Sequence, residues 1–393
     1  MQRQIFDEEH EMFRDTVRAF MKNEIEPHSD RWHEAGIVDR EAFLKAGEMG
    51  FLLMWAEEEY GGIDVRDFRY EQILIEENAH YGDPGFFMTL HSRLVGPYFD
   101  NFATAEQKAR WLPKCISGEQ ILAIAITEPG AGSDVAGLRT KAEDKGDHYL
   151  LNGSKTYISN GILADLVIVV ARTDPNNTHG LSLFVVERGM EGFERGRNLR
   201  KMGLKSQDTA ELFFNNVKVP KENLLGEFNR GFYHLMHGLA EERLLGACGY
   251  VASAEAAFNL TLEYVNDRKA FGRAIADFQN TRFKMADMRT EIDVGYAFVD
   301  RCVDAHNEGK LTAEDAAKAK LWTSELEGRV TDECVQLHGG AGYMDEYKVS
   351  RLYTNARVSR IYAGSSEIMR EIIARSIGLD PRKRQKTSKA DAA

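Results

Sequence analysis

Apolar side chains recur every three or four residues in the first part of the chain, which is the spacing of an amphipathic helix. One such run consists of Phe13, Val17, Phe20, Met21 and Ile25. Pro27 follows this run and is expected to end the helix. Thr104 and Gln107 have the spacing of a capping box, in which each side chain bonds the other residue's main-chain N–H at a helix start. Residues 1–118 are therefore predicted to form a helical domain.

From about residue 119 the apolar runs shorten to strand length and lose the helical spacing. Strands are predicted at residues 121–126, 149–158, 165–172, 180–187 and 211–219. Asn152-Gly153, inside the second run, is the strongest short signal for a hairpin turn. Residues 119–228 are predicted to form a β domain.

Helical periodicity returns at Gly231, in long stretches around residues 231–266, 278–308 and 312–337. Thr312 and Asp315 suit the start of the last stretch. Long amphipathic helices joined by short loops predict a helical bundle over residues 229–380. The final residues, 381–393, are basic and polar and are expected to be a flexible tail rather than a binding arm.

Composition narrows the class of protein without indicating an activity. The 393 residues are 43% hydrophobic, which allows a sizeable core, and the formal net charge is −12. That charge argues against nucleic acid or an anionic membrane as the main partner. The four cysteines are widely spaced, so neither a disulfide framework nor a cysteine metal site is expected. No apolar run approaches the roughly 20 residues of a membrane span, and the N-terminal segment lacks signal-peptide character, so a cytoplasmic protein of bacterial type is predicted.

Two segments of the predicted β domain combine small residues with hydroxyl and aromatic side chains. Thr127-Glu-Pro-Gly-Ala-Gly-Ser-Asp134 directly follows a predicted strand, and its glycines let a ligand approach the main chain. Tyr157 and Ser159 are two residues apart and so share one face of a strand, where they could cover and bond a flat heterocycle. An ordinary glycine-rich turn and an ordinary surface strand explain the same residues.

Three segments of the predicted bundle contain further candidates. Arg268 has the planar donor group that suits a pyrophosphate, although it could equally complement a helix dipole. Gln336-Leu-His-Gly-Gly-Ala-Gly342 ends a helix with glycines that admit close contact, and its His338 is interpreted as a partner of the helix dipole. Ser365 is placed to cap the last helix, whose first amides could bind an anion.

The helix around Gly238–Gly246 is the most unusual segment. Its side chains are apolar or small nearly all round, which is typical of a buried helix. Glu241 and Glu242 lie in it, and buried acids are rare unless they are paired or functional. Glu242 shares a stripe with Gly246 and Gly249, which leave space beside its carboxylate. A buried ion pair with an arginine is the alternative, and periodicity does not choose between the two acids.

Together and in this order, these motifs resemble the acyl-CoA dehydrogenase family over residues 5–377. The resemblance rests on Thr127–Asp134, on Arg268-Lys-Ala-Phe-Gly272 and on Gln336-Leu-His-Gly-Gly340, at the separations typical of that family. Residues 201–214 and 333–340 are most similar to its long-chain type. The resemblance implies an α+β multidomain fold with an N-terminal helical domain, a central β-barrel-like domain and a C-terminal four-helix bundle.

The resemblance also implies FAD as the cofactor and a homotetramer built as a dimer of dimers. By that similarity, Thr127 and Ser159 bond the isoalloxazine edge, and Tyr157 covers the ring. Ser133 lies near the thioester and the flavin phosphates, while Ser365 and Glu367 reach the adenosine side. The residues expected to serve the FAD of a neighbouring subunit are Arg268, Phe271, Gln279, Gln336 and Gly340.

One position departs from the commonest family pattern. Many members carry the catalytic glutamate directly before Gly364, where this chain has Ala363. In the long-chain and isovaleryl types the base lies on the first bundle helix, and Glu242, followed by Arg243, matches it. The resemblance therefore favours Glu242 as the base, with Arg243, Ala363, Gly364 and Ser133 beside the substrate.

The implied reaction is α,β-dehydrogenation of a saturated acyl-CoA, of medium to long chain, to the trans-2-enoyl-CoA of fatty-acid β-oxidation. Electrons are expected to pass to electron-transfer flavoprotein. The N–H of Ala363 is expected to stabilise the enolate oxygen, and burial is expected to raise the basicity of Glu242. The alternatives are a short branched-chain (isovaleryl-like) dehydrogenase, an oxidase or hydroxylase of the same fold, and a flavin-retaining protein without activity.

Overall fold

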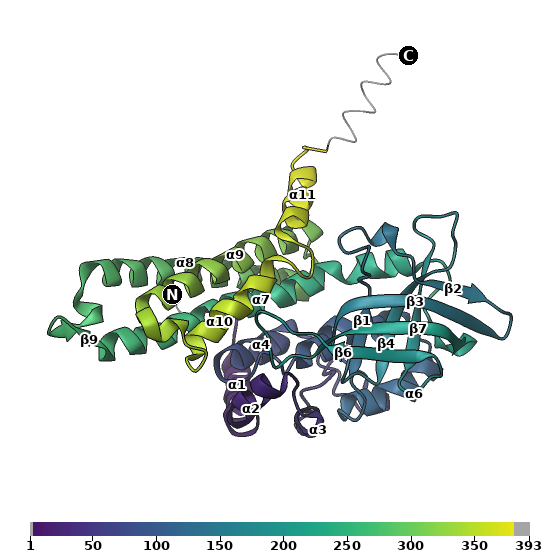
Figure 1. Ribbon diagram of the computed structural model, residues 1–393, viewed down its shortest axis with the longest axis horizontal. Helices are drawn as coiled ribbons and strands as arrows, with labels where there is room; N and C mark the ends of the chain where they lie inside the picture. The colour runs from purple at the N-terminus through teal and green to yellow at the C-terminus, as the bar shows by residue number, and fades with distance from the viewer. Residues whose placement is uncertain (1–2, 381–393) are drawn as a thin grey trace, which may run out of the picture. The chain divides into compact units, whose positions relative to one another are not determined.

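The computed structural model describes residues 3–380, and these form two compact units. We name them the sheet unit, residues 6–239, and the bundle unit, residues 3–5 with 240–380. The predicted succession of helices, strands and helices is confirmed (Figure 1). Within the described range no helix is long and apolar enough to cross a bilayer, and no cluster of His, Cys, Asp and Glu side chains could hold a metal ion.

Six α-helices precede the sheet: α1 (Glu8–Phe20), α2 (Ser29–Ala35), α3 (Arg40–Glu48), α4 (Phe68–Tyr81), α5 (Gly96–Phe102) and α6 (Ala105–Ile116). The capping box of Thr104 and Gln107 is confirmed at the start of α6. Pro27 does not stop the helical path, because the chain continues through a π-helical turn and a 3-10 turn into α2. Pro27 occupies an early position of that 3-10 turn, where its missing N–H removes no helical hydrogen bond.

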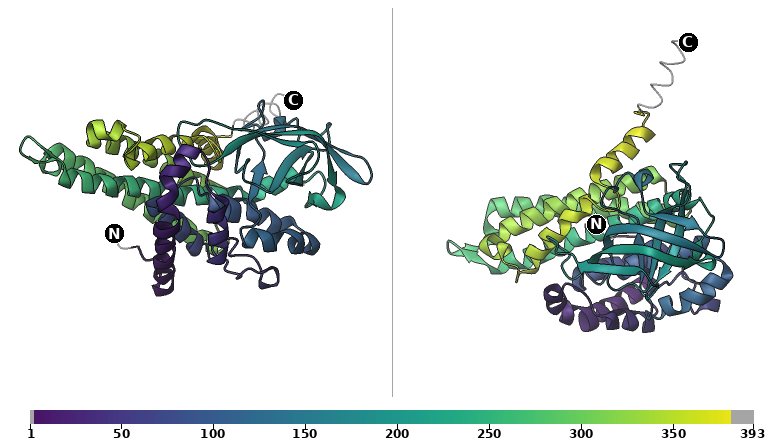
Figure 2. Two further views of the ribbon diagram at one scale, coloured as in Figure 1. Left: turned by 60° about the horizontal axis from the view of Figure 1, so that its bottom comes forward. Right: turned by 45° about the vertical axis from the view of Figure 1, so that its right-hand side comes forward.

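Eight strands form the sheet: β1 (Leu122–Ala125), β2 (Lys141–Asp144), β3 (His148–Ser159), β4 (Leu166–Arg172), β5 (Leu181–Glu187), β6 (Phe193–Asn198), β7 (Thr209–Pro220) and β8 (Leu224–Leu225). Their order is β6-β7-β3-β2-β4-β5-β8, with β1 paired in parallel to β4. Figure 2 shows the sheet from two further sides. The predicted central β domain is confirmed. The pairing leaves β6 and β8 at opposite ends, so the described strands make an open sheet and not a closed barrel.

The hairpin turn predicted at Asn152-Gly153 is wrong, because β3 runs through both residues. The pairing of β3 with β7 shifts register between Leu151 and Gly153, so the dipeptide forms an irregularity within the strand. Gly153 has φ of +147°, and a Cβ there would lie 2.5 Å from the hydroxyl oxygen of Thr140. Glycine is therefore needed for close approach of the neighbouring strand.

The sheet separates two hydrophobic cores. Alternate residues of β4 point to opposite faces: Ile168 and Val170 lie in the core shared with the N-terminal helices, and Val167 and Val169 lie in the core over β3 and β7. A strand buried on both faces explains why this part of the sequence is a continuous apolar run.

The helices after the sheet are α7 (Gly231–Asp267), α8 (Gln279–Asn307), α9 (Ala313–His338), α10 (Lys348–Ala356) and α11 (Ser366–Ser376) (Figure 1). The predicted cap at Thr312 is confirmed, since its side chain accepts a hydrogen bond from the N–H of Asp315. In the bundle unit α9 packs against α8, α10 and α11. The division between the two units falls at Leu239, inside α7. The predicted flexible tail, 381–393, lies outside the described residues.

Candidate active site

The glycine-rich loop 127–134 is anchored by a buried ion pair in the sheet unit. Lys155, fully buried in β3, donates to the carboxylate of Glu128 at 2.8 Å. Glu128 also accepts hydrogen bonds from the N–H groups of Arg139 at 2.7 Å and Thr140 at 2.9 Å. Burial lowers the pKa of Lys155 to about 8. The Glu128 carboxylate thus fixes the loop to the Lys155 side chain of β3 and to the main chain at residues 139 and 140.

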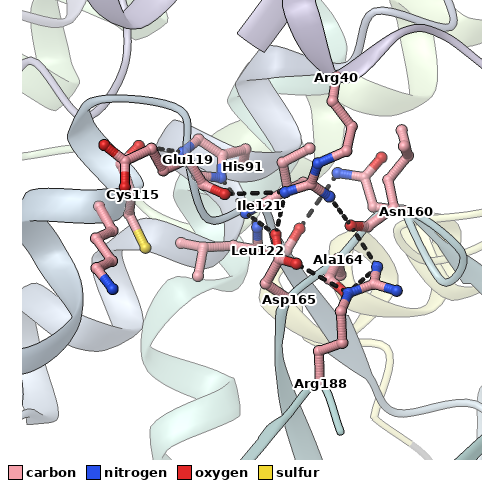
Figure 3. A network of polar contacts seen from close by, with 12 residues as sticks. Arg40, His91, Cys115, Glu119, Ile121, Leu122, Asn160, Ala164, Asp165 and Arg188 are labelled. Carbon is pink, nitrogen blue, oxygen red and sulfur yellow. Dashed lines mark hydrogen bonds and ion pairs between the residues drawn. The ribbon is translucent and has the colours of Figure 1, made fainter. Parts of the chain in front are cut away.

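The strand that leads into this loop is fixed by a polar network (Figure 3). Leu122 donates its N–H to Nδ1 of His91 at 3.0 Å, and its carbonyl accepts from Asn160 at 3.2 Å. Nε2 of His91 donates to the carbonyl of Cys115 at 2.9 Å, and burial lowers the pKa of His91 to about 4, so the imidazole is neutral. Asp165 accepts further hydrogen bonds from Ile121, Arg40 and Arg188.

Thr127, Tyr157 and Ser159, predicted to contact a flavin ring, lie on the loop and on the end of β3. The carbonyl of Thr127 accepts from the N–H of Thr156 at 2.9 Å, which places the start of the loop beside Tyr157. Tyr157 has φ of +60°, and its side chain is 70% exposed. Holding a non-glycine residue in this conformation costs of order 1–3 kcal/mol, and such strain is concentrated at ligand sites.

These residues fit FAD. Ser133 and the glycines of the loop are exposed, and a Cβ at Gly130 or Gly132 would meet nothing within 4 Å, so the main chain is open to a ligand. The half-buried hydroxyls of Thr127 and Ser159 can bond the polar edge of a flat ring, and the exposed phenol ring of Tyr157 can cover its face.

In the bundle unit, the two adjacent acids of α7 have different surroundings. Glu241 accepts a hydrogen bond from Nε2 of His306 on α8 at 2.9 Å. Glu242 is half-buried, so the prediction that it is a buried acid is wrong. Its neighbour Arg243 is only 5% exposed. Burial lowers the pKa of Arg243, and the charge of Glu242 opposes that shift.

The stripe of Glu242 continues to a buried tyrosine. A Cβ at Gly246 would lie 2.7 Å from the hydroxyl oxygen of Tyr250, so this phenol fills the space that the glycine leaves. Tyr250 is 5% exposed and hydrogen-bonded to Tyr362, and burial raises its pKa. Tyr362 directly precedes the loop that contains Ala363, so α7 and this loop are joined by side chains.

The loop before α11 turns sharply at Ala363 and Gly364, whose φ angles are +51° and +88°. The predicted cap is confirmed, since the Ser365 side chain accepts from the N–H of Ile368 at 3.5 Å. Within the described part of the chain, the N–H of Ala363 donates to no acceptor. An exposed residue with a free N–H, just before a helix N-terminus, can bind a developing oxyanion. The carbonyl of Gly364 accepts from Lys320 of α9, a residue that the sequence analysis did not single out.

The residues expected to serve a neighbouring subunit are all exposed: Arg268, Phe271, Gln279, Gln336 and Gly340. Phe271 and Gly272, with φ of +52° and +80°, form the two-residue turn between β9 (Lys269–Ala270) and β10 (Arg273–Ala274). This turn leaves the Phe271 side chain 96% exposed.

His338 connects the end of α9 to the end of α7. Its ring stacks on Tyr264 at 4.2 Å, and its Nδ1 donates to the carbonyl of Cys334 at 2.8 Å. Burial lowers the pKa of His338, which favours the neutral ring, and its interpretation as a partner of the helix dipole stays a prediction. Its role in the structure is to pack two segments together.

Comparison with known proteins agrees with this architecture. The sequence matches the N-terminal domain of acyl-CoA dehydrogenase over residues 7–119, the middle domain over 123–217 and the C-terminal domain over 229–378. It is 48% identical over 381 residues to the mitochondrial long-chain specific acyl-CoA dehydrogenase of Mus musculus, covering 96% of this chain and 88% of that protein. It is 37% identical to the mitochondrial isovaleryl-CoA dehydrogenase of Pongo abelii, covering 95% and 89%.

A solved structure supports the same assignment. The acyl-CoA dehydrogenase of Geobacillus kaustophilus matches with a TM-score of 0.94 and 48% identity, over 96% of this chain and 100% of that chain. The similarity spans the helices and the sheet together, and the cofactor of the family suits the exposed loop at 127–134 and the end of β3 described above. The chain therefore belongs to the acyl-CoA dehydrogenase family and is an FAD-dependent oxidoreductase of fatty-acid oxidation.

Proposed function

We propose that this enzyme dehydrogenates saturated, straight-chain acyl-CoA esters of medium to long chain length, with Glu242 as the base and electron-transfer flavoprotein as the acceptor. The proposal rests on one observation: Ala363 occupies the loop position where many family members have the base, while the half-buried Glu242 lies on α7. The 48% identity to a long-chain specific enzyme supports the chain length. The ion pair of Glu241 with His306 supports Glu242 rather than its neighbour.

The proposed chemistry divides between α7 and the loop before α11. Glu242 accepts the α-proton, and the neighbouring Arg243 interacts favourably with its charge. The free N–H of Ala363 donates to the thioester oxygen as negative charge develops there. FAD, when bound, supplies the acceptor for the β-hydride. Loss of one proton and one hydride converts the Cα–Cβ single bond into the trans double bond.

The cofactor contacts are part of the same proposal. We assign the flavin ring to Thr127, Tyr157 and Ser159, the thioester and phosphate region to Ser133, and the adenosine side to Ser365 and Glu367. The exposed residues of the β9–β10 turn and of the end of α9 are assigned to the FAD of a second copy, within a tetramer. The three domains are taken to divide after residues 118 and 228.

A panel of saturated acyl-CoA esters from C4 to C18, with isovaleryl-CoA, tests the substrate. The measurement is anaerobic bleaching of the flavin, and we expect the highest rate constant at medium to long straight chains. A maximum at isovaleryl-CoA would favour the branched-chain alternative. Bleaching by none of the esters would contradict the proposed activity, and faster turnover with oxygen than with electron-transfer flavoprotein would indicate an oxidase.

A further inference from the structure

Lys320, in the middle of α9, has a fully buried side chain. Its ammonium donates to the carbonyl of Gly364 at 2.7 Å. Burial and, to a lesser extent, the charge of Arg243 of α7 lower the pKa of Lys320 to about 8, against the opposing charge of Glu367 of α11. A buried charge is unfavourable unless it is paired or hydrogen-bonded, so this hydrogen bond determines where the ammonium lies.

The turn that Lys320 contacts is conformationally demanding. Ala363 and Gly364 are both left-handed, and for alanine that conformation is strained. The side chain of Tyr362, just before the turn, is hydrogen-bonded to Tyr250 of α7. Lys320 provides the second attachment, on the other side of Ala363. Among the described residues, the hydrogen bond from Lys320 is the one that joins the peptide groups just after Ala363 to a long helix of the bundle unit.

We propose that Lys320 is a positioning residue for the dehydrogenation, holding the turn so that the N–H of Ala363 stays directed at the thioester oxygen. This inference rests on the proposed function. Lys320 acts through the carbonyl of Gly364 and not on the substrate. Its charge also interacts with that of Arg243, next to Glu242, so one ammonium contacts the turn of the oxyanion site and senses the charge of a residue beside the base.

The test compares two lysines of α9. Lys320→Met keeps an unbranched apolar side chain and removes both charge and donor. Lys318→Met is the matched control, because Lys318 is two residues away, partly exposed and paired with Glu314. The probe is a 3-thia-acyl-CoA: its α-proton is acidic, and its sulfur in place of the β-carbon has no hydride to give. Its absorbance on the holoenzyme, titrated with pH, therefore reports deprotonation alone.

We expect Lys320→Met to raise the apparent pKa of the bound analogue by about one unit or more. The rate constant of flavin reduction by an acyl-CoA should fall roughly ten- to hundredfold. The Kd of the acyl-CoA should change less than about threefold, and FAD content should be unchanged. Lys318→Met should alter none of these quantities.

A Lys320→Met enzyme with the parental analogue pKa and the parental reduction rate would overturn the proposal. If that variant retains no FAD, Lys320→Gln, which keeps a donor on a shorter side chain, is measured in the same way. Loss of FAD from both variants would also overturn the proposal, since Lys320 would then act in folding. If an acyl-CoA reduces the parent enzyme and the Lys320 variants behave like the parent, only the role of Lys320 is refuted. If no acyl-CoA reduces the parent enzyme, the proposed function is refuted as well.

Discussion

Glu241 and Glu242 are adjacent in sequence and equal in chemistry, and their partners distinguish them. Glu241 is paired with His306, whereas Glu242 is half-buried and lies beside the buried Arg243. Glu242→Gln keeps the size of the side chain and removes its ability to accept a proton. Flavin reduction by an acyl-CoA, followed by anaerobic stopped-flow, should fall at least about a hundredfold, while FAD and enoyl-CoA still bind.

Glu241→Gln is the control for this experiment. It removes a half-buried ion pair with His306, which is worth less than about 1 kcal/mol, so the reduction rate should stay close to that of the parent. A slow Glu241→Gln enzyme and a fast Glu242→Gln enzyme would show that the base lies on the other stripe of α7.

Ala363 offers a complementary test. A glutamate there, in the Glu242→Gln background, restores the commoner family arrangement. Because Ala363 already has φ of +51°, replacing it with glutamate lengthens the side chain but adds no backbone strain beyond what alanine already bears. We expect the reduction rate to recover by about tenfold or more but to stay below that of the parent, with shorter acyl chains favoured. No recovery with any chain length would mean that the turn does not face the substrate α-carbon.

At this scale the sequence identified the acids and the caps but missed Lys320. A single lysine in an amphipathic helix is normally interpreted as an exposed residue. The sequence did contain one sign of burial: Ala316, Ala317 and Thr323, one helical turn from Lys320, are small residues that leave room for a buried lysine side chain. Their small size indicates space around Lys320, but only the fold shows that the carbonyl of Gly364 lies within reach of its ammonium.

At the scale of elements, the starts of helices were predicted better than an irregularity inside a strand. The caps at Thr104, Thr312 and Ser365 depend on hydrogen bonds within one turn, which a short sequence specifies. Asn152-Gly153 also has a strong local preference, for a hairpin, but its outcome depends on pairing with β7 and on contact with Thr140. Tertiary packing overrode the local preference there.

The network at the start of β1 makes the stability of the protein depend on pH. His91 is neutral when folded, with a pKa lowered to about 4, whereas in the unfolded chain its pKa is about 6.5. Between these values the unfolded chain binds a proton that the folded chain does not. The free energy of unfolding should therefore decrease as pH falls through this window, by about 3 kcal/mol in total from this group.

His91→Gln isolates this contribution, because glutamine keeps one acceptor for Leu122 and one donor for Cys115 but does not titrate. Urea unfolding of the holoenzyme, measured from pH 7.5 down to pH 4.5, should give a flatter pH dependence for the variant. Parallel curves for the two proteins would show that His91 does not cause the acid sensitivity.

At the scale of the whole molecule, the order of helical, β and helical segments was predictable because the period of the apolar residues changes at each transition. The open form of the sheet was not, since the order of strands depends on contacts between residues far apart in sequence. The residues proposed to contact the FAD of a second copy are exposed in the single chain, and the β9–β10 turn among them can be tested by mutation.

Arg268, beside that turn, is the clearest candidate for a contact with the FAD of a neighbouring subunit. Arg268→Ala removes a charge-assisted hydrogen bond to phosphate worth about 1.5–3 kcal/mol, so FAD should be lost more readily on dilution. Flavin fluorescence measures the released FAD, and light scattering gives the oligomeric state. Lys269→Ala, one residue away, is the matched control and should retain FAD. A monomer that keeps FAD at nanomolar concentration would contradict the shared site.

The contact between Gly246 and Tyr250 also constrains how this protein can diverge. A Cβ at position 246 would lie 2.7 Å from the hydroxyl oxygen of Tyr250, so the phenol, which is hydrogen-bonded to Tyr362, would have to move. Relatives with a larger residue at 246 should therefore have a smaller one at 250, and the two positions should covary. Along a mutational path between the two arrangements, replacing the tyrosine before the glycine avoids this close contact, so one order of substitutions is favoured over the other.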